Sequence, residues 1–402
     1  MPPFVSKVSL TVEDIAATEV WLRIGFADAA APREFSLRRN GTVVASGTFT
    51  GTDTLVGDPT LRPLQVLSYK AFRMSGGIPV DSSTALSVTT RDTTSHLFSS
   101  IRIDTLGNVS PSALYDVAIL GPDDIIAVGE IYRHGPTVDT LYNMARWDGQ
   151  QWNLMKIQFL TFCGQPATSV YPTRALFAFS LSDIWISSGS QIVRWNGSTQ
   201  SPPECIPVSV NALWGENANS VFAVGYGGAV AHFDGTSWTR LESGTTATIN
   251  DIWGAVDGEG KRTVLCAVSN HLQGGEHKIL SIDETGAVDS LHWVSEKEVY
   301  SIWFDSPARL FTAGEGLFSR GPDMMWNEFL QTPRIYTYRI RGPQANDLMI
   351  SGGFGLVLHW NGVSFNEYPE AAATAYTCAY NGTLMVAVGY RGALAVVAQM
   401  RR

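Results

Sequence analysis

A repeated pattern of about 40 residues dominates this sequence from residue 111 onward, and such a period decides the fold. Each repeat opens with two apolar segments that a polar turn separates, as in YDVAIL (115–120) and DIIAVG (124–129). A Gly-rich turn leads to a third segment, which often ends in an aromatic residue followed by Asp or Asn and Gly. The alternating apolar residues and the turn residues predict short antiparallel strands.

Aromatic anchors set the number of repeats. Trp147, Trp195, Phe233 and Trp360 are separated by 48, 38 and 127 residues, and the last interval holds two weaker repeats. Seven first segments and seven second segments can be counted. Four strands in each unit of about 40 residues are typical of a propeller blade, so we expect a seven-bladed β-propeller over residues 95–402. Residues 96–104 are expected to supply the outer strand of the last blade and close the ring, because an open sheet edge would otherwise remain.

Residues 1–94 lack the repeat and read as about seven short alternating strands. Asn40-Gly41 is a hairpin signal between two of these strands. We therefore expect an all-β chain in which a β-sandwich precedes the propeller. Trp21, on the second strand, is predicted to lie in the core of the sandwich.

The segment LRPLQVLSYKAF (61–72) resembles a stretch of the fibronectin type III family, with Leu67 where that family usually has a tyrosine. The repeats, such as NDLMISGGFGLVLHWNGVSF (346–365), resemble exported bacterial propeller proteins and lipoproteins of largely undefined function. The repeats also resemble the Asp-box of sialidase-like propellers, although Asp148-Gly149 and Asp234-Gly235 are adjacent here. The resemblance implies an architecture and an exported location rather than a reaction.

Composition excludes several function classes. The net charge of −9 argues against a nucleic-acid partner, which would need a basic surface. The apolar fraction of 45% is too high for a disordered chain. No run of about 18 apolar residues is present, so we expect no membrane span. The first ten residues carry no apolar leader; with few Lys and Arg and many Thr, Ser and Gly, we expect an exported protein, extracellular or at the cell surface, whose leader is not in this sequence.

The four cysteines form no metal-binding pattern. Cys163 and Cys205 lie in Gly- or Pro-containing loops of consecutive repeats, and the sequence leaves open whether they form a disulfide, which would imply an oxidising compartment. Cys266 and Cys378 lie in apolar segments and are expected to be buried thiols. We predict no metal site and no cofactor. Calcium in the channel stays open, because carbonyl ligands leave no mark in a sequence.

The turns between second and third strands carry the candidate ligand-binding residues, since these turns meet around one channel mouth. The candidates are Glu130, Tyr132, Tyr226, Asn270, His271, Glu315, Phe354, Tyr390 and Arg391. Aromatic rings beside Glu, Asn and Arg suit sugars or peptides. The turn after Glu130 is the longest and is expected to overhang this face. The opposing interpretation is an ordinary rim of solvated turn residues.

No catalytic residue is assigned, and three functions are weighed. The first is a non-enzymatic exported binding or scaffold protein whose propeller face binds a glycan, peptide or partner protein. The second is a carbohydrate-active hydrolase or lyase that uses the same face, with Glu130 and Glu315 as its carboxylates. The third is a structural subunit of a surface assembly. An anion clamp of Arg320, Arg341 and Arg391 is not expected, because their repeat positions differ. His232 and His359 share one repeat position with Arg146 and Arg194, which favours a structural role.

Overall fold

The computed structural model describes residues 7–27, 30–257, 260–270, 275–293, 295–371 and 374–402, nearly all of which lie in strands and turns. The N-terminal part forms two antiparallel sheets with eight strands in its described residues. The three-stranded sheet is ordered β1-β2-β5, and in the other sheet β4-β3-β6-β7 are joined by β8, which pairs with β6. The strands are β1 (Val8–Ile15), β2 (Val20–Phe26), β3 (Arg33–Arg39), β4 (Thr42–Phe49), β5 (Asp53–Asp58), β6 (Val66–Ser75), β7 (Ile78–Ser82) and β8 (Leu86–Thr89).

The two N-terminal sheets enclose one apolar core, but Trp21 lies outside it. Val20, Leu22 and Ile24 on β2 are fully buried in that core, with Tyr69 of β6. Side chains alternate between the two faces of a strand, so Trp21 points the other way and is only half-buried. The prediction that Trp21 is a core residue was therefore wrong, because β2 presents its aliphatic side chains to the core.

Seven four-stranded antiparallel sheets follow in the part of the chain that the structure describes, and we call them ring sheets one to seven. Ring sheet one contains β10 (Val109–Gly121), β11 (Asp124–Arg133), β12 (Thr140–Trp147) and β13 (Trp152–Met155), and ring sheet two contains β16 (Leu176–Ser180), β17 (Asp183–Ser188), β18 (Gln191–Trp195) and β19 (Glu204–Cys205). Ring sheet three contains β20 (Val210–Asn217), β21 (Ser220–Gly225), β22 (Val230–Phe233) and β23 (Trp238–Leu241), and ring sheet four contains β24 (Ile249–Val256), β25 (Arg262–Ser269), β26 (His277–Ile282) and β27 (Val288–Leu291). Ring sheet five contains β28 (Val299–Ser306), β29 (Arg309–Gly314), β30 (Gly316–Arg320) and β31 (Trp326–Glu328), and ring sheet six contains β32 (Thr337–Gln344), β33 (Asp347–Gly352), β34 (Val357–Trp360) and β35 (Phe365–Glu367). A hairpin of β14 (Gln158–Leu160) and β15 (Thr168–Val170) links the first two ring sheets.

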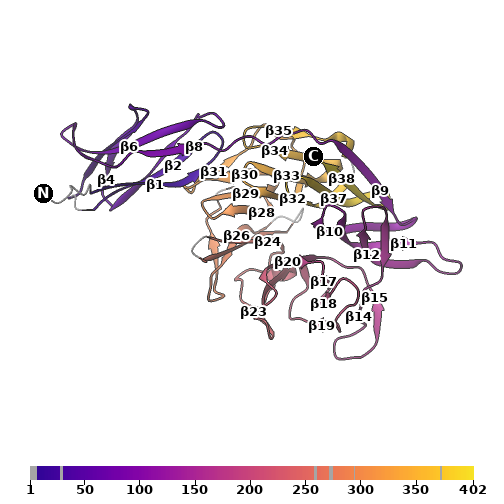
Figure 1. Ribbon diagram of the computed structural model, residues 1–402. Helices are drawn as coiled ribbons and strands as arrows, with labels where there is room; N and C mark the ends of the chain where they lie inside the picture. Colours follow the sequence, from indigo (N-terminus) through magenta and orange to yellow (C-terminus); the bar gives the residue numbers. More distant parts are fainter. Residues whose placement is uncertain (1–6, 28–29, 258–259, 271–274, 294, 372–373) are drawn as a thin grey trace.

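Ring sheet seven is completed by a strand from far earlier in the chain. Its strands are β36 (Thr374–Tyr380), β37 (Leu384–Arg391), β38 (Leu394–Arg401) and β9 (Ser100–Leu106). β9 pairs with β38 from Ala395↔Leu106 to Arg401↔Ser100, and Figure 1 shows it crossing to the yellow C-terminal strands. The expected closing segment, 96–104, therefore began four residues too early. The first strands contact one another in cyclic order, with β36 returning to β10, so the sheets form a closed ring.

Apolar clusters lie between neighbouring ring sheets and hold the ring together. Trp185 of ring sheet two packs in one cluster with Phe233 of ring sheet three, with ring centroids 5.3 Å apart. Trp303 of ring sheet five shares another with Leu358 of ring sheet six, and comparable clusters join the remaining neighbours. Trp147, Trp185 and Trp303 are at most 3% exposed. The high tryptophan content therefore serves packing between sheets.

Recurrent polar residues at the ends of third strands are structural. The Asp148 carboxylate accepts the backbone N–H groups of Gln150 and Gln151, and Asp234 accepts those of Thr236 and Ser237. Such side-chain-to-backbone bonds build the tight turn that the Asp/Asn-Gly pattern requires.

The repeat position of His232 and His359 pairs with the start of the second strand. Arg146 binds Asp124 at 2.7 Å, and His359 lies 2.8 Å from Asp347 in the same arrangement. His232 contacts Ser220 at 3.1 Å. The expectation of a structural role for this position agrees with these contacts.

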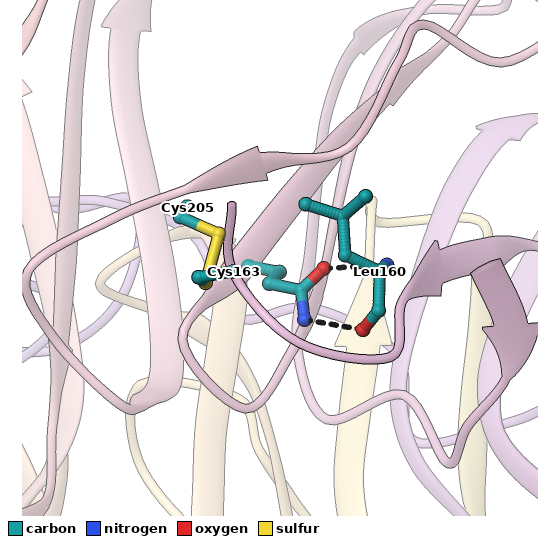
Figure 2. The surroundings of a disulfide bond; sticks show 4 residues. Leu160, Cys163 and Cys205 are labelled. Carbon is teal, nitrogen blue, oxygen red and sulfur yellow. Dashed lines mark hydrogen bonds between the residues drawn. A yellow bond between two sulfur atoms is a disulfide. The ribbon is translucent and has the colours of Figure 1, made fainter. Parts of the chain in front are cut away.

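A disulfide fastens the connection between ring sheets one and two. Cys163, between β14 and β15, is bonded to Cys205 of β19, as Figure 2 shows. Beside it, the Gln191 amide accepts the Leu160 N–H at 2.8 Å and donates to the Leu160 carbonyl at 2.9 Å. Cys266 and Cys378 are buried free thiols, as the sequence predicts.

The N-terminal sheets contact only one end of the ring among the described residues. Arg309, the first residue of β29 beside the turn from β28, binds Asp14 at 2.6 Å and also Glu19. Arg91 binds Asp305 at the same turn at 3.4 Å. These turns join first to second strands, so the end formed by second-to-third turns lies away from the N-terminal sheets.

Candidate functional site

A β-bulge interrupts the first strand of the ring sheets at one repeat position. The pairing shifts there in six ring sheets, for example between Val299 and Ser301 and between Thr337 and Arg339. In ring sheet two, Ser187 bonds the backbone of both Arg174 and Ala175, which marks the same irregularity. We call the seven residues at this position the mouth ring: Tyr115, Arg174, Asn211, Asn250, Tyr300, Tyr338 and Tyr376. A bulge re-aims a side chain, and here it does so once in each sheet at the mouth of the central channel.

Five members of the mouth ring form a continuous arc of contacts. The Arg174 guanidinium lies 4.9 Å from the centroid of the Tyr115 ring. The rings of Tyr115 and Tyr376 are 5.5 Å apart, those of Tyr376 and Tyr338 are 6.0 Å apart, and those of Tyr338 and Tyr300 are 5.3 Å apart. Each ring remains partly exposed. The arc therefore presents adjacent phenol edges and faces at the channel mouth.

The tyrosines of the mouth ring stay neutral at physiological pH. Burial raises the pKa of Tyr115, and the hydrogen bond that its hydroxyl donates to Glu130 at 2.6 Å raises it further. Burial and the neighbouring Tyr390 raise the pKa of Tyr376 to about 12. Burial also raises the pKa of Tyr300 and Tyr338. The phenols thus remain hydrogen-bond donors and acceptors.

A buried charge cluster lies one residue further along the first strands. Asp251 accepts from Arg341 at 2.7 Å, from Ser301 at 2.5 Å and from Arg339. Asp116 is 3.7 Å from Arg339. Burial disfavours ionisation of Asp251, but the two guanidinium groups outweigh it and hold its pKa below the usual value. Burial raises the pKa of Asp116. Asp116, Arg339 and Arg341 of this cluster line a cavity of about 180 Å³.

Three of the predicted ligand-binding residues are next to the mouth ring. The Glu130 carboxylate accepts from Tyr115 at 2.6 Å and from Tyr132 at 3.4 Å. The Tyr390 ring packs 5.2 Å from Tyr376. The turn after Glu130 is shorter than expected, because β11 and β12 extend into it and leave only residues 134–139 outside the strands. The extended hairpin replaces the overhanging loop that the sequence suggested.

The other predicted residues are more scattered. Tyr226 and Phe354 occupy equivalent turns and are 53% and 91% exposed. Asn270 accepts the backbone N–H of Thr248 at 2.9 Å, which is a structural contact. Arg391 is exposed at the end of β37. His271 lies outside the described residues.

Glu315 lines a separate cavity of about 660 Å³ at this end of the ring, between ring sheets five and six. Glu298 and Tyr336 also line it, and the Tyr336 hydroxyl donates to Glu298 at 2.8 Å. Tyr336 packs 5.8 Å from Tyr300 of the mouth ring. The cavity and the mouth ring are therefore joined through Tyr336.

None of the seven mouth-ring residues was among the ligand-binding residues predicted from the sequence. Tyr115, Tyr300, Tyr338 and Tyr376 were included in first-strand segments, but alternation alone does not reveal a bulge. A signal existed in the Gly that ends several second strands: a Cβ atom at Gly225 would lie 1.7 Å from the backbone oxygen of Ser209, the residue just before β20. Such a Gly marks a close backbone approach. Among the three arginines considered as a clamp, Arg341 joins the buried cluster, whereas Arg320 lies over Trp326 on the outer strands.

No family model matches the chain, and no curated protein matches it. Among solved structures, the one titled "YCF48 bound to D1 peptide" is similar with a TM-score of 0.56 and 14% identity, covering 77% of this chain and 97% of that chain. YCF48 from Cyanidioschyzon merolae has a TM-score of 0.53, 12% identity and coverage of 74% and 98%. The WD40 β-propeller domain of Doa1 has a TM-score of 0.51, 11% identity and coverage of 75% and 97%. At these identities the likeness concerns the fold, and together with the ring of four-stranded sheets it shows that this chain contains a β-propeller.

Proposed function

We propose that this protein is a non-enzymatic binding scaffold: a seven-bladed propeller behind a fibronectin type III-like sandwich, with the mouth ring as the binding face for a peptide segment of a partner protein. The observation that carries the proposal is the arc from Arg174 through Tyr115, Tyr376 and Tyr338 to Tyr300. Six first strands and the segment just before β16 each contribute one residue to this position, and the Asn and Arg residues at three of the seven places indicate that sheet packing alone does not require tyrosine there.

Tyrosine suits a protein-binding face for physical reasons. Its ring supplies a large apolar contact, and its hydroxyl makes directional hydrogen bonds at little cost in conformational entropy. The arc is flanked by an anionic group, Glu130, and by the cavity that Glu298 and Glu315 line. A peptide can lay side chains on the rings while its backbone bonds the phenols. The solved structure of YCF48 with a peptide supports peptide binding by a similar fold.

An exported location is part of the proposal. Its support is the disulfide between Cys163 and Cys205, because such bonds persist in oxidising compartments. No helix among the described residues is long and apolar enough to cross a membrane. The sandwich then serves as a spacer or a second contact at the opposite end of the ring.

The test is selection of peptides from a displayed random library on the immobilised full chain, with a glycan array run in parallel. The double variant Tyr376→Ala/Tyr390→Ala removes two contacting rings of the face. Loss of two interface tyrosines is expected to weaken a selected peptide by at least about 30-fold, corresponding to about 2 kcal/mol. The control, Tyr142→Ala, removes a partly buried tyrosine on β12, where Lys156 covers it.

Peptide binding that survives the double variant would refute the mouth ring as the binding face. If the chain binds a glycan but no peptide, and the double variant loses that binding, the ligand of the mouth ring is a sugar and not a peptide. Turnover of a polysaccharide that disappears in Glu130→Gln would refute the non-enzymatic assignment.

A further inference from the structure

We propose a second binding site, for a neutral monosaccharide-sized ligand, in the cleft between the N-terminal sheets and ring sheets five and six. This interdomain cleft has a volume of about 330 Å³ and is lined by residues including Glu19, Trp21, Arg309, Asp323, Asn346 and Trp360. That volume falls at the lower end of the range for small-molecule sites, roughly 300–1,000 Å³, and such sites favour domain interfaces. The site is at the end of the ring opposite the mouth ring, so this inference does not rest on the proposed function.

Two residues that line the cleft each carry a buried polar atom that lacks a hydrogen-bond partner among the described residues. One is the amide oxygen of Asn346, a residue that is 5% exposed; its amide nitrogen donates to the Asp92 carbonyl at 2.6 Å. The other is the indole N–H of Trp21. A buried polar group without a partner costs about 1–3 kcal/mol. Both atoms are buried in this structure, so the two side chains must turn slightly toward the cleft before a ligand hydroxyl, which both donates and accepts, can bond them.

Three of the four charged side chains that line the cleft, those of Glu19, Arg91 and Arg309, are in ion pairs, and the fourth, Asp323, is exposed and accepts the Met325 N–H. Arg309 binds Asp14 and Glu19, and Arg91 binds Asp305. An anionic or cationic ligand would have to compete with these ion pairs. The pairing therefore favours a ligand without net charge.

Aromatic rings supply the walls. Trp360 and Phe329 pack with ring centroids 5.0 Å apart, and both line the cleft together with Trp21. Trp21 is half-buried, and its side chain points away from the sandwich core. Aromatic walls with a few convergent polar groups suit a compact molecule that has apolar C–H faces and hydroxyl edges. A neutral hexose or N-acetylhexosamine has this chemistry.

The experiment measures binding of D-glucose, D-galactose, D-mannose and N-acetyl-D-glucosamine to the full chain by isothermal titration calorimetry and saturation-transfer NMR. Gly321→Leu fills the cleft: a Cβ atom at Gly321 would lie 3.4 Å from an Asp323 carboxylate oxygen and 3.8 Å from the Trp21 indole nitrogen, which are ordinary contact distances. Trp21→Phe keeps a ring and removes the N–H. Trp238→Phe is the matched control, because its indole nitrogen is also buried without a partner but lies on β23, outside the cleft.

We expect at least one of the four sugars to bind with a dissociation constant near or below about 1 mM. Trp21→Phe should weaken it by about 5- to 10-fold, which corresponds to the loss of one hydrogen bond. Gly321→Leu should abolish binding, and Trp238→Phe should leave it unchanged. The proposal is overturned if none of the four sugars binds, or if binding persists in Gly321→Leu, which would place the sugar elsewhere. If Gly321→Leu fails to fold, equal affinity in wild type and Trp21→Phe overturns it.

Discussion

Removal of Asp251 should destabilise the protein strongly, because it leaves two buried arginines without their main partner. The side chains of Arg339 and Arg341 are 11% and 13% exposed, and both bind Asp251. After Asp251→Ala, the nearest described carboxylate to Arg339 is Asp116, 3.7 Å away. Breaking a buried ion pair by removing one partner costs about 3–5 kcal/mol. For a propeller of roughly 300 residues that unfolds as one unit, this lowers Tm by about 5–8 °C.

The assay is urea unfolding followed by tryptophan fluorescence, with Tm from calorimetry. The control is Asp183→Ala, which breaks the exposed pair with Arg194 at 3.2 Å and should cost at most about 1 kcal/mol. Because the pKa of Asp251 is lowered in the fold, its stabilisation is present above the unfolded pKa and disappears as the pH falls through the folded value. If Asp251→Ala costs no more than the control, the buried cluster does not stabilise the ring as argued.

Three further predictions concern other contacts. The double variant Cys163→Ser/Cys205→Ser opens a loop with a sequence separation of 42 residues, and its free energy of unfolding in urea should fall by about 4 kcal/mol. Arg309→Ala leaves two carboxylates at the junction unpaired, so small-angle X-ray scattering should show a larger maximum dimension as the N-terminal sheets move away from the ring. Burial lowers the pKa of His359, so the imidazole of this residue takes up a proton more readily in the unfolded chain than in the fold. The stability of the protein should therefore fall as the pH drops below about 6.5, the pKa of an unperturbed histidine. His359→Gln should reduce the difference in Tm between pH 7 and pH 5.

The free energy of unfolding of the wild type under reducing conditions should match that of the double serine variant. Equal stability of the wild type with and without reductant would contradict the stabilising role of the disulfide. The control Arg194→Ala should leave the scattering curve unchanged. An unchanged curve in Arg309→Ala would contradict the role of Arg309 in holding the N-terminal sheets against the ring. His134, whose side chain is 77% exposed, supplies the control His134→Gln; an identical pH dependence of His359→Gln and wild type would contradict the third prediction.

The candidate site could be predicted from the sequence only in part. The turns after second strands pointed to Glu130, Tyr132 and Tyr390, which lie at the mouth ring or against its tyrosines. Tyr300 and Tyr338 were missed, because their direction depends on a bulge that shifts the alternation by one residue.

What the sequence by itself determined was the strands, their turns and their repetition. Alternation and turn chemistry are local properties, so YDVAIL and DIIAVG predict the pair β10 and β11 without knowledge of the rest. Tertiary structure alone decided which distant residues meet. Asp251 and Arg339 are 88 residues apart, and the sequence predicted that a segment near β9 closes the ring but not the residues of β38 that it meets. Likewise, Trp21 reaches the interdomain cleft because β2 turns that face toward the propeller. Such contacts depend on how whole sheets pack around one axis, which no short stretch of sequence encodes.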